Sequence, residues 1–170
     1  MKPKLRLILT GILFLLLGLT EFCVGPLWWG CNPPYLLCAV VVYAMFSGEK
    51  SAALFGLFSG LFADSMTSGV FGLHGVMYLF FGYMIVFLTE KIISGNVFSC
   101  TITGILTVAL NEFALWGIEN LDHPTDLLTA AQYVFLPRLV MSLPLLFLLY
   151  SLFSFLFRER DGYSAGRRFP

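Results

Sequence analysis

The sequence has few charged residues. Asp, Glu, Lys and Arg make up 12% of its 170 residues, whereas hydrophobic residues make up 58% and the mean hydropathy is +0.86. An average soluble domain is about a quarter charged. A small water-soluble fold cannot hide that much apolar surface, so the composition excludes an ordinary soluble domain and indicates a chain that is solvated mainly by lipid.

The sequence also lacks a net charge, a set of residues spaced as metal ligands, and any catalytic motif. Ten basic residues balance ten acidic ones, so we expect no nucleic acid or polyanionic partner. The sequence contains no P-loop, dinucleotide-binding glycine motif, nucleophile elbow, zincin helix or pair of catalytic carboxylates. We therefore expect no enzymatic activity, no cofactor and no metal. The four cysteines show no C-x-x-C pair and are interpreted as small buried hydrophobic residues, with a Cys23–Cys31 disulfide as the alternative.

Six apolar stretches account for most of the chain. They are residues 5–24, 35–47, 51–66, 70–88, 97–118 and 131–157, and a short basic tail follows at 158–170. We predict a single all-α integral membrane domain, a compact bundle of six transmembrane helices. The first stretch is interpreted as a retained span and not a cleaved signal peptide, because it has the roughly 20 residues that a span needs and no small-x-small cleavage site follows it.

The second and third stretches are short for a hydrocarbon core of about 30 Å. Three arrangements are compatible with their length. The two helices can lie inside the bundle where the membrane is locally thin, or the Trp28-Trp29 and Pro33-Pro34 loop can dip into the interface. The third possibility is a re-entrant hairpin covered by other helices.

The distribution of basic residues predicts the orientation, because short cytoplasmic loops collect Lys and Arg. With six crossings and a cytoplasmic N-terminus, every Lys and Arg except Arg138 is placed on the cytoplasmic side, and the outer loops contain only acidic charges. The tryptophans Trp28, Trp29 and Trp116 then lie near the outer interface, where aromatic belts form. We therefore predict a multi-pass plasma-membrane protein with both termini in the cytoplasm.

Charges are costly inside a bilayer, and Glu112 and Arg138 lie one or more helical turns inside the ends of their apolar stretches. Glu112 is in the fifth stretch and Arg138 is in the sixth, at similar depth if the two helices are antiparallel neighbours. We expect them to form an intramembrane ion pair, directly or through water. The pair is interpreted as a coupling site or ligand anchor, and the alternatives are a structural ion pair or an Arg that snorkels outward. Glu21 is a possible further partner, although its position near the end of the first stretch favours contact with the interface.

A stripe of small residues marks the third stretch. Ala52, Gly56, Gly60 and Asp64 recur every fourth residue and therefore share one helix face. Small residues spaced in this way let two helix backbones approach closely in lipid. The stripe predicts either a contact inside the bundle or a surface for a partner helix.

The segment after this stripe predicts a sharp reversal. Gly69 and Gly72 permit the turn, and Asp64 can cap the next helix, whose dipole favours a carboxylate at its N-terminus. His74 then lies in the first turn of that helix, where we interpret it as a hydrogen-bonded structural residue, since a metal site would need further ligands.

From about residue 32 to residue 88 the chain resembles the MreD family of rod shape-determining proteins. The ordered series that carries the resemblance is Gly48, Gly56-Leu57-x-x-Gly60-Leu61-x-x-Asp64, Gly69-x-x-Gly72-Leu73-His74, Tyr78 and Gly82-Tyr83. The length, the six spans and the basic tail are similar too. One departure is Pro33-Pro34-Tyr35, where the family often has Pro-Asp, so any role of that aspartate is absent or moved.

The resemblance implies a membrane scaffold of the bacterial cell-elongation machinery, which maintains rod shape and lateral peptidoglycan synthesis. The partners it implies are the single-span protein MreC, the glycosyltransferase RodA with a class B penicillin-binding protein, and MreB, directly or indirectly. The implied fold is similar to the substrate-binding subunits of energy-coupling-factor transporters. We expect the partner to pack on the third or fourth stretch, at Gly56, Gly60 and Gly72. The alternative is such a vitamin-binding subunit itself, with Glu112 or Arg138 fixing a ligand in an outward pocket.

Overall fold

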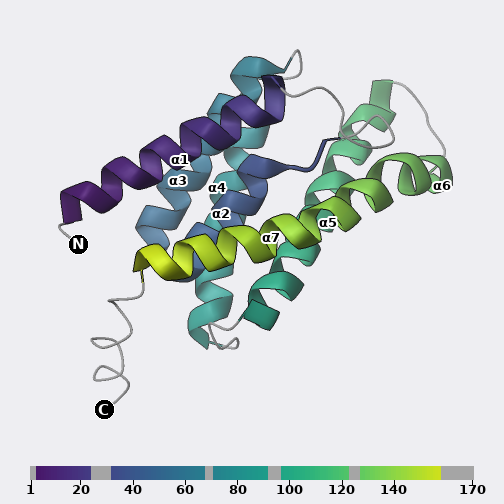
Figure 1. Cartoon of the computed structure of the whole chain (residues 1–170). Helices are drawn as coiled ribbons and strands as arrows, with labels where there is room; N and C mark the ends of the chain where they lie inside the picture. Colours follow the sequence, from purple (N-terminus) through teal and green to yellow (C-terminus); the bar gives the residue numbers. More distant parts are fainter. Residues whose placement is uncertain (1–2, 24–31, 68–70, 92–96, 123–126, 158–170) are drawn as a thin grey trace.

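A computed structural model describes residues 3–23, 32–67, 71–91, 97–122 and 127–157, and helices make up nearly all of them (Figure 1). The elements are α1 (Pro3–Cys23), α2 (Tyr35–Phe46), α3 (Glu49–Met66), α4 (Leu73–Lys91), α5 (Val97–Asp122), α6 (Leu127–Ala130), a π-helical segment (Ala131–Phe135) and α7 (Leu136–Phe157). The last three form one continuous rod. The all-α prediction is confirmed, and the helices occupy the six apolar stretches with ends shifted by a few residues.

Helix α2 lies at the centre of the bundle. It contacts α1, α3, α4, α5 and α7, and every residue from Leu36 to Val42 is buried. Its sequence is apolar on all faces, which is the pattern of a helix with no exposed side. Twelve residues extend only about 18 Å, but a helix enclosed by protein does not need to span the hydrocarbon. For α2 this enclosure fits a short helix inside the bundle and equally a re-entrant hairpin covered by other helices.

The surrounding helices form two flanks. Helices α3 and α4 pack along each other on one side, and α5 and α7 pack on the other, whereas α4 and α5 touch only slightly (Figure 1). Helix α1 lies against α2 and α3. The beginning of α1 and the end of α7 lie on the same side of the bundle in Figure 1, as expected for an even number of antiparallel rods.

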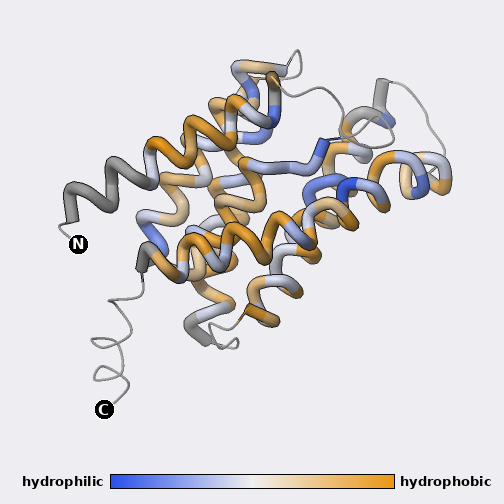
Figure 2. Tube along the Cα trace, viewed as in Figure 1, coloured by the Kyte–Doolittle hydropathy of each residue, from blue (hydrophilic) through white to orange (hydrophobic). Residues whose placement is uncertain are grey.

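The outer surface of the bundle is apolar. In the described part of the chain, residues 97–118 and 128–155 are long and apolar enough to span a membrane, and shorter apolar helices cover 10–21, 35–46 and 73–89. Figure 2 shows hydrophobic residues along most of the helices. Large side chains such as Phe80, Phe98, Phe147 and Phe155 are exposed. Contiguous apolar surface of this kind is unusual in water, and together with the helix lengths it fits a helical membrane protein.

The π-helical segment before α7 has a cause in the sequence. Pro137 has no backbone N–H, so it cannot donate to the carbonyl four residues earlier. The helix instead widens over Ala131–Phe135, and the N–H of Leu136 donates to the carbonyl of Ala131, five residues away. This register shift directly precedes Arg138 and therefore sets the direction in which that side chain leaves the helix.

Candidate functional site

Asp64 connects the end of α3 to the beginning of α4. Its Oδ2 accepts hydrogen bonds from the backbone N–H groups of Gly72 (2.9 Å) and Gly75 (3.1 Å). Its Oδ1 accepts the N–H of His74 at 3.2 Å and lies 2.8 Å from Nδ1 of the His74 ring. The carboxylate thus occupies the N-terminus of α4, where unpaired N–H groups and the helix dipole favour a negative charge.

Gly72 and His74 complete this turn. Gly72 has φ +96°, a conformation that costs little only for glycine. The His74 ring is held by Asp64 and packs edge-on against Tyr78, with ring centroids 5.8 Å apart. His74 is therefore a hydrogen-bonded residue of this turn, as interpreted from the sequence. Gly69, the other glycine of the sequence motif, lies outside the described residues.

The small-residue stripe of α3 packs against α4. A Cβ added to Gly56 would collide with the backbone carbonyl of Tyr78, and one added to Gly60 would collide with that of His74. In the opposite direction, a Cβ on Gly82 would lie 2.6 Å from the carbonyl of Ala52. The two antiparallel backbones are therefore in direct contact over several turns, as small residues in membrane helices allow.

This contact decides between the two interpretations of the small-residue stripe on α3. Gly56 and Gly60 are buried by α4 and cannot be reached by another helix, so the stripe is a contact inside the bundle. The sequence leaves both interpretations open, because the spacing of small residues on one helix does not identify the helix that packs against them. Gly75 and Gly82, seven residues apart on α4, are the small residues in the sequence that indicate the facing surface of α4.

Arg138 of α7 and Glu112 of α5 lie against each other between the two packed helices. The guanidinium Nη1 donates to Oε2 of Glu112 at 2.7 Å. The Glu112 side chain is 3% exposed and that of Arg138 is 33% exposed. A buried carboxylate needs such a partner, because removing a charge from water without one is strongly unfavourable. Sequence position alone had placed these two residues at similar depth.

Glu21 is placed differently from the expectation that it reaches the interface. Its Oε2 accepts the backbone N–H of Leu36 at 2.9 Å, so the carboxylate caps the N-terminus of α2. Its backbone carbonyl accepts a hydrogen bond from Nδ2 of Asn32 at 3.3 Å. The side chain also interacts electrostatically with Arg138 and Glu112. Glu21 therefore ties α1 to α2 and belongs to the same group of charges as the ion pair.

Other polar atoms are buried near this group of charges. Within the described part of the chain, Oδ1 of Asn111, Nε1 of Trp116 and Nε of Arg138 are buried and have no hydrogen-bond partner. Glu112 and Trp116 are one helical turn apart and share a face of α5. Among the described residues there is no group of three metal-ligating side chains.

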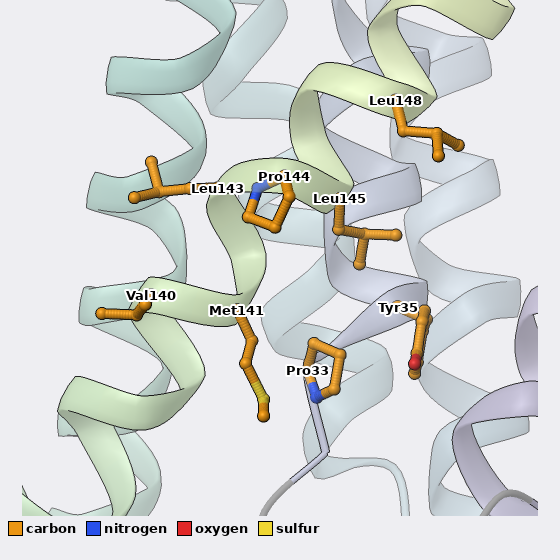
Figure 3. A pocket seen from close by; sticks show the side chains of 8 residues that line it. All are labelled: Pro33, Tyr35, Val140, Met141, Leu143, Pro144, Leu145 and Leu148. Atoms are coloured by element: carbon orange, nitrogen blue, oxygen red, sulfur yellow. The ribbon is translucent and has the colours of Figure 1, made fainter. Parts of the chain in front are cut away.

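An apolar groove lies on the outside of the bundle between the start of α2 and α7 (Figure 3). It encloses about 530 Å³. The residues that line it are Pro33, Tyr35, Val140, Met141, Leu143, Pro144, Leu145 and Leu148. Sequence reasoning did not find this groove, because its two walls are separated by more than 100 residues. The Trp28-Trp29 loop, near which the vitamin-binding alternative predicts its outward pocket, lies outside the described residues.

A comparison with known protein families matches nearly the whole chain. The family described as rod shape-determining protein MreD matches residues 2–160. The rod shape-determining protein MreD of Bacillus subtilis (strain 168) is 26% identical over 117 residues, which cover 65% of this chain and 65% of that relative, just under two thirds of its length. No solved structure matches the chain. The family match includes every helix described above, and the chain therefore belongs to the MreD family of rod shape-determining proteins, a family of structural proteins and not a known family of enzymes.

Proposed function

We propose that this protein is a membrane scaffold of the bacterial cell-elongation machinery, which binds an MreC-like single-span protein and helps to maintain lateral peptidoglycan synthesis. The observation that carries the proposal is the family match over residues 2–160. Through MreC, the scaffold would connect RodA and its class B penicillin-binding protein to MreB.

The distribution of polar contacts supports a scaffold. Asp64, Glu21 and Glu112 each bind another helix of the same bundle. The outward faces of α4, α5 and α7 are apolar. A partner must therefore contact mainly the lipid-facing surfaces of the helices. Moving an apolar surface from lipid to protein gains no hydrophobic free energy, so shape and a few polar contacts decide whether two helices associate. A single-span partner presents that kind of surface.

We further propose that the bundle crosses the plasma membrane six times with both termini in the cytoplasm. The positions of the basic residues support this orientation. A fold similar to the substrate-binding subunits of energy-coupling-factor transporters remains part of the proposal.

Affinity purification from native membranes tests the function. The full chain, tagged and expressed at its natural level, is expected to retain an MreC-like protein after mild detergent extraction, and its depletion is expected to turn rods into round cells. A tagged multi-pass protein of unrelated function is the control. Recovery of a bound vitamin without any MreC-like protein would overturn the scaffold and favour the transporter subunit.

A further inference from the structure

Two contacts fix how the antiparallel helices α5 and α7 are aligned. A Cβ added to Gly104 would collide with the side chain of Leu146, and Glu112 binds Arg138. Gly104 and Glu112 are eight residues apart on α5, and the residues they meet are eight apart on α7 in the opposite order. The two helices therefore keep one register over this stretch, so every α5 residue within it has a defined level on α7.

Asn111 lies in this stretch, one residue before Glu112. It follows Gly104 by about two helical turns and shares its inward face, and the register places it at the level of Arg138 and Leu139. The residue is 2% exposed, and its Oδ1 is buried with no hydrogen-bond partner. An amide at this depth needs a partner from within the bundle, because the surrounding hydrocarbon offers none.

Arg138 has the complementary atom at the same level. Its Nη1 donates to Oε2 of Glu112 at 2.7 Å, whereas its Nε is buried and has no partner. The Nε of a guanidinium carries one N–H and can only donate. Asn111 thus has an acceptor without a donor, and Arg138 has a donor without an acceptor, on two helices whose own contacts hold them together. The two atoms do not bond to each other.

We propose that the interior of the bundle between α5 and α7 binds a water molecule that accepts the Nε–H of Arg138 and donates to Oδ1 of Asn111. The donor and acceptor select water, since a metal cation cannot accept a hydrogen bond and a simple anion cannot donate one. Asn111 is too deeply buried for a lipid headgroup or a partner's side chain to reach it. Buried waters bridge otherwise unsatisfied polar groups in this way. The inference goes beyond the scaffold function and does not depend on it.

Thr103 on the same helix provides a matched contrast. Its Oγ1 is also buried without a partner, and the residue is 5% exposed. The register places Thr103 level with Phe147, whose side chain has no polar atom. Because a bound water needs at least two polar partners, we expect no water at Thr103.

Two substitutions of similar shape test the bridge through stability. Asn111→Leu removes the acceptor, so we expect a lower melting temperature of the full chain in detergent. Thr103→Val removes a hydroxyl that bridges nothing, so we expect an unchanged or higher melting temperature. An unchanged or higher melting temperature for Asn111→Leu would overturn the proposal, because it would show that the amide has no partner to lose.

Hydroxyl-radical labelling separates a water bridge from a direct bond between the two side chains. An X-ray pulse generates radicals from water, bound water included, in the full chain held in lipid nanodiscs, and mass spectrometry locates the modified residues. We expect several-fold more modification of Leu139, at the level of Asn111, than of Leu145, which is also a partly buried leucine of α7. Asn111→Leu should remove this excess. Equal modification of both leucines in the parent chain would mean that Asn111 bonds Arg138 directly, and the proposal would be wrong.

Discussion

Asp64 shows how much one carboxylate can organise in a membrane protein. Both of its oxygens are used, and they serve three backbone N–H groups and one imidazole. In Asp64→Asn one of these oxygens becomes an NH₂ group, which cannot accept. We expect a loss of about 1–3 kcal/mol in the free energy of unfolding, measured as a lower melting temperature in detergent.

The neighbouring Ser65→Ala is the control for this prediction. Ser65 is exposed and its hydroxyl donates to the carbonyl of Phe62 in the same helix, so the loss of this hydroxyl should change the unfolding free energy by less than about 0.5 kcal/mol. Equal melting temperatures for Asp64→Asn and Ser65→Ala would show that the cap contributes little to stability.

The ion pair allows an asymmetric prediction. Arg138→Met leaves a carboxylate buried without its partner, and we expect a loss of about 3–5 kcal/mol in unfolding free energy. We expect a smaller loss of unfolding free energy for Glu112→Gln, because the Arg138 side chain is partly exposed and can extend toward a more polar environment. The double variant should recover much of the loss of Arg138→Met, since residue 112 then carries no charge. Additive losses, measured in a detergent unfolding cycle, would mean that the two charges do not depend on each other.

The contacts of a polar side chain could be predicted from the sequence in two situations. Either the contacting residue is close along the chain, or it lies at the same depth in an antiparallel neighbouring helix. Asp64 is eight residues from Gly72, and a turn between two helices makes the cap foreseeable. Glu21 was misplaced because its partner, Leu36, is reached through the loop between α1 and α2, and nothing in the sequence specifies that path.

At the scale of elements, the α3–α4 contact is the most tightly specified. Gly60→Ala would force a methyl group against the carbonyl of His74. The backbone of α4 cannot move aside as easily as the end of a flexible side chain. We therefore expect a loss of about 1–3 kcal/mol in unfolding free energy. Gly117→Ala on α5 meets nothing within 4 Å and should be neutral or slightly stabilising. A stable Gly60→Ala with unaltered melting temperature would mean that the helices can separate without cost.

The helices themselves were predictable to different degrees. Uniform hydrophobicity identified α2 as a helix, and burial on every side explains that pattern. The π-helical segment was missed although Pro137 is its sequence signal. The stripe on α3 predicted a close contact but not its partner, because helical periodicity describes one face and contains no information about the helix opposite.

At the scale of the whole molecule, the placement of charges predicts how the bundle is threaded through the membrane. The predicted outer loops contain no Lys or Arg, whereas the segments predicted to face the cytoplasm contain all but one of them. The structure adds that α1 begins and α7 ends on the same side (Figure 1). These two observations are independent, since one concerns composition and the other packing, and together they favour an even number of crossings.

Thiol labelling tests this threading. In a variant whose four native cysteines are replaced by alanine, Ser164→Cys in the basic tail and Thr125→Cys in the predicted outer loop are treated with a membrane-impermeant maleimide. Because positive residues are retained in the cytoplasm, we expect Thr125→Cys to react in intact cells and Ser164→Cys to react only after the membrane is opened. Labelling of Ser164→Cys in intact cells would invert or break the arrangement, since Arg158, Arg160, Arg167 and Arg168 would then all lie outside.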